Sequence, residues 1–158
     1  LINQGFQSSI KSPWMVLAGD NLMDFSLSKA VEKHSENVKQ PLFLVRKIKG
    51  FIPPNQYSEV RLDSLGFVKQ IREKPKNPSS PYSAIGVYLL PCELPKLLAK
   101  YLQQGGIADQ PGHFMAWLSL ERKCRFWKIP DGLWWDVGCL DSYKQAKKAR
   151  LNNLNFSL

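Results

Sequence analysis

Cysteine and histidine are scarce in this sequence, which has three residues of the first type and two of the second. Cys92, Cys124 and Cys139 are odd in number and stand at unrelated spacings, so they predict no disulfide framework and indicate a reducing, cytoplasmic environment. His34 and His113 have no partner at the spacing of a zinc site or of a catalytic dyad. A zinc protein and a histidine-based catalyst are therefore not expected.

Long apolar runs and the familiar nucleotide-binding motifs are missing as well. The longest apolar runs, such as residues 14–18 and 41–45, fall far short of the ~20 residues that cross a bilayer. The sequence contains no G-x-x-x-x-G-K-[ST], no G-x-G-x-x-G and no G-x-S-x-G. We therefore expect no membrane partner, and we exclude the P-loop proteins, the Rossmann dinucleotide-binding proteins and the serine hydrolases.

Acidic residues are in the minority, because 13 Asp and Glu stand against 22 Lys and Arg and leave a net charge of +9. Such a balance raises the question of nucleic acid or of an anionic surface as a partner. Only one tight basic group exists, formed by Lys144, Lys147, Lys148 and Arg150, and it lies in a helical pattern where it favours the helix dipole. We interpret this group as a solvated helix face and expect no nucleic-acid partner.

The rest of the composition is typical of a folded domain. Of 158 residues, 44% are hydrophobic and 22% charged, which is sufficient for a core without disulfide or metal staples. We find no internal repeat and no linker, so residues 1–158 are expected to belong to a single domain. The residues as given begin at Leu1 without an initiator methionine, and we interpret the chain as the larger part of a domain whose beginning is missing.

Apolar runs alternate with helical patterns along the chain. Residues 14–18 and 41–48 are typical of strands buried on both faces, and 84–90 is a further apolar strand. Residues 93–104 and 114–120 show helical spacing. This alternation predicts an α/β fold with a parallel core. The remaining expected elements are a surface helix near 28–36, a hairpin of 57–62 and 67–71, a strand at 125–129 and a helix from Asp141.

Three charged residues are candidates for binding a metal ion or a phosphate. Asp20 follows a buried strand and a glycine, where a carboxylate can bind Mg²⁺, although such an aspartate can equally cap a helix or form a turn. Asp136 lies in an apolar setting and needs a partner or a cation. If the two carboxylates meet in space, they make one divalent site. Lys74, at a strand end, can hold a phosphate or can be a solvated surface charge.

Six short motifs follow one another in a fixed order, and a set of six is far more specific than any single one. The motifs are Leu17-Ala18-Gly19-Asp20-Asn21, then residues 57–63 with Gly66 and Val68, Ile71-Arg72-Glu73-Lys74-Pro75, Ser83-Ala84-Ile85-Gly86-Val87-Tyr88, Asp109-Gln110-Pro111-Gly112-His113-Phe114, and Trp134-Trp135-Asp136-Val137-Gly138. Their order and spacing resemble those of the sugar-1-phosphate nucleotidylyltransferases over residues 12–149.

The resemblance implies a fold and a reaction. The implied fold is a three-layer α/β/α sandwich with a mostly parallel, mixed sheet. The implied reaction transfers a nucleoside monophosphate from a nucleoside triphosphate to a sugar 1-phosphate, releasing pyrophosphate and forming a nucleoside diphosphate sugar. The alternative is a degenerate or regulatory homologue that binds the sugar nucleotide without turnover. Association with a second copy of the chain stays open.

The resemblance also implies the roles of individual residues. Asp20 and Asp136 match the two aspartates that hold the catalytic Mg²⁺. Glu73 and Lys74 match the E-K-P motif, which implies that Glu73 binds sugar hydroxyls and Lys74 the sugar phosphate. Together with the metal pair, Lys74 is the expected catalytic residue.

The sugar pocket is expected to include three further residues. Gly86 and Tyr88 match the strand that lines the pocket. Ser58 stands where the family has a glycine whose backbone approaches the sugar, so it is expected to alter that contact.

The family's glycine-rich loop, with its Thr-Arg and a downstream Pro-Lys, has no counterpart in these residues. In the family this loop cradles the triphosphate and supplies the cation that helps pyrophosphate leave. We therefore expect the chain to be the C-terminal portion of the nucleotidyltransferase domain, which binds the sugar phosphate and the metal.

Overall fold

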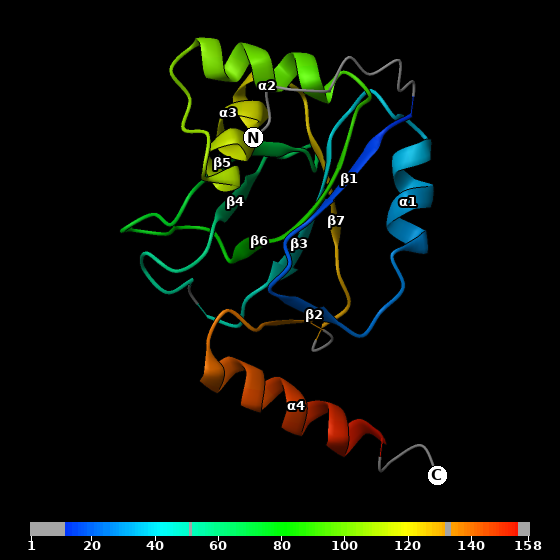
Figure 1. The fold of residues 1–158 in the computed structure, drawn as a ribbon, viewed down its shortest axis with the longest axis vertical. Helices are drawn as coiled ribbons and strands as arrows, with labels where there is room; N and C mark the ends of the chain where they lie inside the picture. Colours follow the sequence, from blue (N-terminus) through cyan, green and yellow to red (C-terminus); the bar gives the residue numbers. More distant parts are fainter. Residues whose placement is uncertain (1–11, 51, 132–133, 155–158) are drawn as a thin grey trace.

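The computed structural model describes residues 12–50, 52–131 and 134–154. Their main feature is a six-stranded sheet, accompanied by a separate two-stranded ribbon and by helices (Figure 1). The sheet contains β1 (Trp14–Leu17), β3 (Leu42–Lys47), β4 (Glu59–Leu62), β5 (Val68–Arg72), β6 (Tyr82–Leu90) and β7 (Arg125–Lys128). The ribbon pairs β2 (Asn21–Met23) with β8 (Trp134–Asp136). The helices are α1 (Ser28–Ser35), α2 (Leu94–Gln103), α3 (Pro111–Glu121) and α4 (Leu140–Leu154).

The sheet is mixed, and its pairing corrects the expectation of a mostly parallel sheet for this part of the chain. Among the described strands, only β3 and β7 pair in parallel. The central strand β6 runs antiparallel to β1, β3 and β4, and β4 pairs antiparallel with β5 as the predicted hairpin. Because β1, β3 and β7 all point the same way, their carboxyl ends lie at one edge of the sheet.

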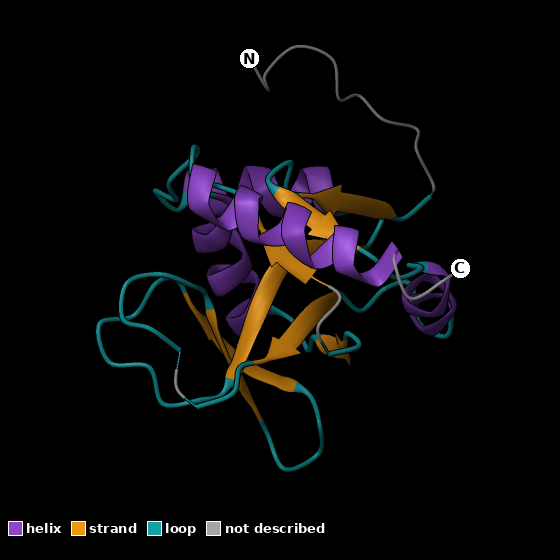
Figure 2. Cartoon of the chain, turned by 90° about the horizontal axis from the view of Figure 1, so that it is seen from below, coloured by secondary structure: helices purple, strands orange, loops and turns teal. Residues whose placement is uncertain are grey.

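The sheet has helices on both faces, which confirms the three-layer α/β arrangement (Figures 1 and 2). On one face, α2 and α3 pack over Phe43, Val45 and Tyr88 in the larger core cluster. On the other face, Ala30 of α1 packs over a smaller cluster that includes Leu44. Successive residues of β3 alternate between the two clusters, as side chains of a strand buried on both sides must.

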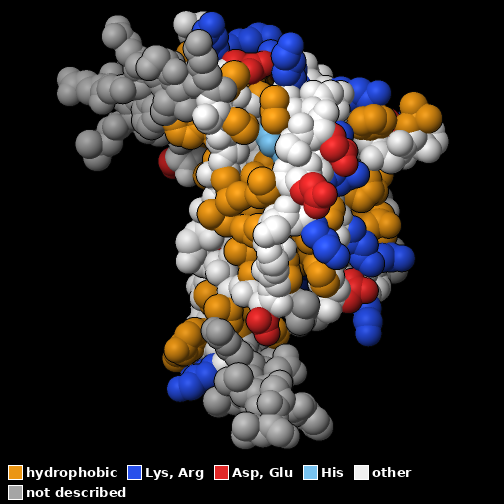
Figure 3. All heavy atoms as spheres, turned by 90° about the vertical axis from the view of Figure 1, so that its right-hand side faces the viewer, with side chains coloured by type: hydrophobic (Ala, Val, Ile, Leu, Met, Phe, Trp, Pro, Cys, Tyr) orange, Lys and Arg blue, Asp and Glu red, His pale blue; other side chains and the backbone are white. Residues whose placement is uncertain are grey.

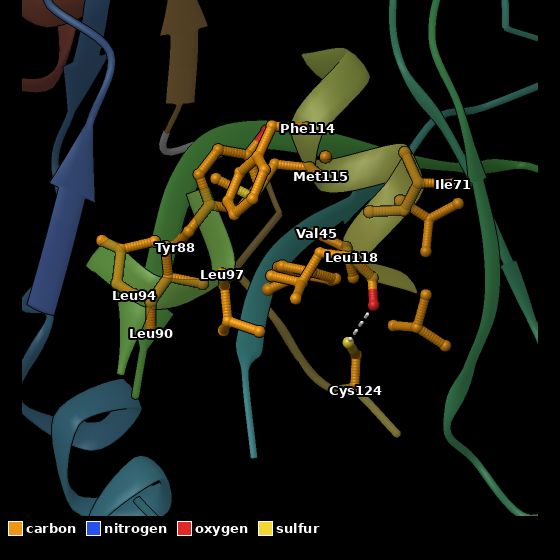
Figure 4. Packing of buried hydrophobic residues seen from close by; sticks show 14 of the residues in the cluster. Val45, Ile71, Tyr88, Leu90, Leu94, Leu97, Phe114, Met115, Leu118 and Cys124 are labelled. Carbon is orange, nitrogen blue, oxygen red and sulfur yellow. Dashed lines mark hydrogen bonds between the residues drawn. The ribbon is translucent and has the colours of Figure 1, made fainter. Parts of the chain in front are cut away.

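In the larger cluster, side chains of β3, β6, α2 and α3 lie against one another (Figure 4). The ring of Tyr88 meets Phe43 edge-on at 5.4 Å between centroids. The thiol of Cys124 donates to the Leu118 carbonyl over 3.8 Å, and burial raises the pKa of this thiol to about 12. All three cysteines are free, and Cys124 serves as a small apolar residue.

Strand β1 differs from its prediction as a strand buried on both faces. Trp14 and Val16 pack against the larger cluster, but the side chains of Met15 and Leu17 are 39% and 49% exposed. Among the described strands, β1 pairs only with β6, so one of its edges has no neighbouring strand. An apolar run by itself does not distinguish such an edge strand from a central one.

The last helix, α4, projects away from the sheet at the bottom of Figure 1. It begins at Leu140, so that Asp141 lies in its first turn, where a carboxylate favours the helix dipole. Lys144, Lys147 and Lys148 are exposed, as a solvated helix face requires. Within the described residues, no helix is long and apolar enough to cross a membrane.

Candidate functional site

A cavity of about 340 Å³ lies where β1 and β4 part from each other along β6. Both strands pair with the same side of β6. β1 pairs with the second half of β6, and β4 pairs with the first residues of β6. Gly86 stands between the two pairings with a φ of +74°, and a Cβ there would lie 2.8 Å from Cβ of Ala18. Only glycine fits this close approach without strain. The cavity is lined by all seven residues proposed from the sequence: Asp20, Ser58, Glu73, Lys74, Gly86, Tyr88 and Asp136.

The two aspartates meet through the ribbon of β2 and β8. Asp20 immediately precedes β2, whose residue Asn21 pairs with Asp136. The Val137 amide donates to the Asp20 carbonyl over 2.8 Å and closes this pairing. A Cβ added to Gly138 would lie 3.1 Å from Oδ1 of Asp136 and 3.6 Å from Oδ2 of Asp20, so both carboxylates converge above this glycine.

This carboxylate pair fits a divalent cation of the magnesium type. Mg²⁺ keeps several waters and takes one or two protein carboxylates together with substrate phosphates. Among the described residues, no group of three or more His, Cys, Asp or Glu could enclose a metal. The two converging carboxylates could therefore be ligands of one such cation.

Two polar neighbours orient the Asp20 side of the pair. The Asn21 amide donates to the Ala18 carbonyl over 3.2 Å and to Oδ1 of Asp20 over 3.4 Å. The indole of Trp134 donates to Oδ1 of Asn21 over 2.7 Å. The sequence motifs contain both Asn21 and Trp134, but no local pattern predicts these contacts.

The Glu73 carboxylate is held at the opposite wall. The Ser58 hydroxyl donates to its Oε2 atom. A Cβ added to Gly112, at the start of α3, would lie 2.1 Å from the same oxygen. Gly112 therefore leaves the space that this carboxylate occupies, a role that nothing in the local sequence signals. Ser58, which stands where the family has a glycine, was predicted to alter a sugar contact. Through this hydrogen bond it also positions Glu73.

Lys74 lies at the end of β5 with an unusual backbone. Its φ is +41°, a conformation that a non-glycine residue rarely adopts. The Asn55 amide donates to the Pro75 carbonyl over 3.1 Å and fixes the turn. Lys74 is exposed and makes no ion pair with a described residue, so its ammonium group is free to meet an anion in the cavity.

Tyr88 forms the buried floor of the cavity. Its side chain is 6% exposed, and burial together with the nearby Glu73 carboxylate raises the pKa of its phenol well above the usual value. The phenol therefore stays protonated and neutral at physiological pH. It can support a sugar ring without adding charge.

Comparison with known proteins identifies the family of this chain. The family model described as nucleotidyl transferase matches residues 2–153. A glucose-1-phosphate adenylyltransferase of Mycoplasma mobile is 23% identical over 141 residues, which cover 88% of this chain and 37% of that protein. The enzyme of the same name from Acetivibrio thermocellus is 25% identical over 134 residues, 84% of this chain and 31% of its own length. The chain thus spans about a third of the length of these relatives.

Solved structures show the same fold. UDP-glucose pyrophosphorylase without ligand superposes with a TM-score of 0.73 at 17% identity, over 90% of this chain and 55% of that one. UDP-glucose pyrophosphorylase complexed with UDP-glucose gives 0.73 at 16% identity, over 92% and 58% of the two chains. From the family match and the shared fold, this chain belongs to the nucleotidyl transferase family.

Proposed function

We propose that the protein containing this chain transfers a nucleoside monophosphate from a nucleoside triphosphate to a sugar 1-phosphate and releases pyrophosphate. One observation carries the proposal: a single cavity gathers two converging carboxylates, an exposed lysine and an oriented glutamate. That set offers one place for a cation, one for a phosphate and one for sugar hydroxyls. Residues 1–158 would supply the portion of the domain that binds the sugar phosphate and the metal.

Lys74 would hold and orient the phosphate of the sugar 1-phosphate. Nucleotidyl transfer is an in-line displacement at phosphorus, and catalysis rests mostly on positioning and on charge neutralisation. A Mg²⁺ ion held by Asp20 and Asp136 would neutralise charge on the reacting phosphates. The attacking phosphate oxygen is already ionised at neutral pH, so the chain needs no general base.

The sugar would lie against the other wall of the cavity. Glu73, oriented by Ser58, would accept hydrogen bonds from sugar hydroxyls. Gly86 would let the sugar approach the backbone of β6, and the neutral phenol of Tyr88 would lie below it. The named relatives include enzymes acting on glucose 1-phosphate, which makes glucose 1-phosphate the first acceptor to test.

The nucleotide is not set by this chain. Relatives and neighbours are named for adenylyl transfer and for UDP-glucose, and the triphosphate cradle of the family has no counterpart in residues 1–158. We place the protein in the cytoplasm, which the three free cysteines and the demand for nucleoside triphosphates support.

The test is pyrophosphate release by the complete gene product over a panel of nucleoside triphosphates and sugar 1-phosphates, with Mg²⁺ present. We expect Asp136→Asn to lower kcat by about a hundredfold or more, because it removes one of two metal ligands. Asp24→Asn is the matched control, since Asp24 is exposed and lines no described cavity, and it should keep full activity. Full activity of Asp136→Asn would refute the metal assignment, and binding of sugar nucleotide without turnover would favour a degenerate homologue.

A further inference from the structure

A second and larger cavity, of about 780 Å³, lies at the carboxyl ends of β3 and β7. It opens at the same edge of the sheet as the first cavity, and Trp134 lines both. Ligands of α/β proteins bind along this edge, outside the carboxyl ends of the strands. No step of the proposed nucleotidyl transfer uses this second cavity.

The second cavity is strongly basic. Among the described residues, four cations line it, namely Arg46, Lys47, Lys49 and Lys128, and the only carboxylate is that of Asp131. Lys128 pairs with this carboxylate at 3.4 Å between Nζ and Oδ1. The other three cations form no ion pair with any described residue. A surplus of three positive charges thus faces one hollow.

Arg46 is held in place, and its guanidinium has a buried donor without an acceptor among the described residues. Its guanidinium carbon lies 4.2 Å from the ring centroid of Trp134 and 4.7 Å from that of Tyr57, so two aromatic rings fix the guanidinium. Its Nε atom is buried without an acceptor among the described residues. A buried donor without a partner costs free energy, and a bound acceptor would remove that cost.

We propose that this second cavity binds a small anion carrying two or more phosphoryl charges, separately from the sugar phosphate. A guanidinium fork matches phosphate oxygens bidentately, and lysines add point charges around it. The volume suits a small-molecule ligand. A free diphosphate and an organic diphosphate present the same chemistry to these residues.

The experiment titrates inorganic pyrophosphate into the isotope-labelled complete gene product without divalent cations and follows the amide signals of this chain by NMR. We expect shifts at residues 46–50 and at Lys128, Ile129 and Asp131. The double variant Lys47→Gln/Lys49→Gln should weaken binding about tenfold, as expected for the loss of two of the charges that surround the ligand. Both lysines are exposed, so this variant should fold, and its spectrum will show it.

The matched control is Lys29→Gln/Lys96→Gln, which removes the same charge from exposed helix positions that line neither cavity. It should change the affinity less than about twofold. Equal weakening in both double variants would show general charge attraction and overturn the proposal. Shifts at Ser58 and Lys74 alone, or no shift at all, would also overturn it.

Two further ligands define the chemistry of the anion. Malonate carries two carboxylates, and binding as tight as that of pyrophosphate would refute the phosphoryl class. ADP carries two phosphoryl groups on an organic molecule, and shifts at the same residues support the proposal. Tighter binding of ADP than of pyrophosphate indicates an organic phosphate, and the reverse indicates a free diphosphate.

Discussion

At the scale of single residues, the first cavity depends on glycines that leave room for charged oxygens. Gly112 faces Oε2 of Glu73, and Gly138 faces the carboxylates of Asp20 and Asp136. A methyl group at either position would push an oxygen out of place. These glycines matter for what lies opposite them rather than for an unusual backbone, since neither has a positive φ.

Gly112→Ala tests the first of these contacts. An added Cβ would lie 2.1 Å from Oε2 of Glu73, so the carboxylate must move away from its position beside Ser58. We expect binding of glucose 1-phosphate to weaken about tenfold, because a misplaced hydrogen-bonding group loses its contact. The measurement is the dissociation constant from calorimetry.

Gly19→Ala is the matched control, since no described atom outside its chain neighbours lies within 4 Å of a Cβ at that position. It should leave the affinity for glucose 1-phosphate nearly unchanged. Stability is not the readout, because alanine within α3 would by itself favour the helix by up to about 1 kcal/mol. Unchanged affinity in Gly112→Ala would show that Glu73 does not contact the sugar.

At the scale of elements, the hairpin of β4 and β5 carries one wall of the cavity and is anchored by a buried carboxylate. Glu59, the first residue of β4, is 0% exposed. It accepts hydrogen bonds from the amides of Ser79 and Ser80 and pairs with Arg72. Burial raises the pKa of Glu59, but these hydrogen bonds outweigh burial and hold it below the usual value.

Glu59→Gln should therefore lower the free energy of unfolding at pH 7 by about 3 kcal/mol, because it leaves the buried side of Arg72 and two amides poorly satisfied. A depressed pKa in the folded state stabilises the protein above pH 4.5, the ordinary value, and this stabilisation is lost as the pH falls through the folded pKa. The difference from the wild type should thus shrink in acid. Urea unfolding at neutral and at acidic pH measures both effects.

The control for this substitution is Glu32→Gln on the exposed face of α1. It should change the free energy of unfolding by less than about 0.5 kcal/mol. A difference between Glu59→Gln and wild type that stayed constant down to strongly acidic pH would mean that the carboxylate is not stabilised in its ionised form.

The contact between α1 and β7 predicts a second pH effect in a different range. His34 in α1 is 3% exposed, and burial together with the charge of Arg125 lowers the pKa of its imidazole below 6.5. The Arg125 guanidinium also donates to the carbonyls of Lys33 and Asn37. This arginine therefore ties the end of the helix to the sheet, and burial together with its charge favours the neutral imidazole of His34.

His34 is protonated more readily in the unfolded chain than in the folded chain. The free energy of unfolding should therefore decrease as the pH falls below 6.5. His34→Gln should remove this part of the pH dependence, whereas His113→Gln should retain it. Thermal or urea unfolding between pH 7.5 and about 5 follows the slope. A slope that persists in His34→Gln would assign the effect to other groups.

Secondary structure follows well from the sequence, but strand direction does not. The apolar spacing of 93–104 identifies α2, and the turn chemistry at Gly66 identifies the β4–β5 hairpin. An apolar run has the same pattern whichever way its neighbour runs, so the antiparallel course of β6 gave no local signal. The site residues were predicted from motifs, whereas contacts such as Glu73 with Gly112 join positions far apart in the chain and required the fold.

At the scale of the whole molecule, the positive charge behind the net value of +9 lies in separate groups rather than in one continuous surface patch. On the side of the molecule where α1 lies, Lys and Arg side chains stand in separate groups with carboxylates between them (Figure 3). Three unpaired cations gather at the second cavity and one lysine at the first. The positive charge thus fits small anions at two places along one edge of the sheet.

The chain spans about a third of its curated relatives, so the reaction as a whole remains a proposal about the complete protein. What the chain itself should do is narrower: bind a divalent cation and a sugar phosphate together. The two carboxylates leave most coordination positions to water and phosphate, so we expect the cation to bind weakly alone and more tightly with glucose 1-phosphate.

Paramagnetic Mn²⁺ tests this central claim most directly, because it broadens NMR signals near its binding site. Added at low concentration to the labelled complete gene product with glucose 1-phosphate, it should broaden the amides of Asp20, Asn21, Asp136 and Gly138 first. The same broadening should persist in Asp24→Asn and disappear in Asp136→Asn. Broadening elsewhere, or at these amides in Asp136→Asn, would contradict the proposed carboxylate pair.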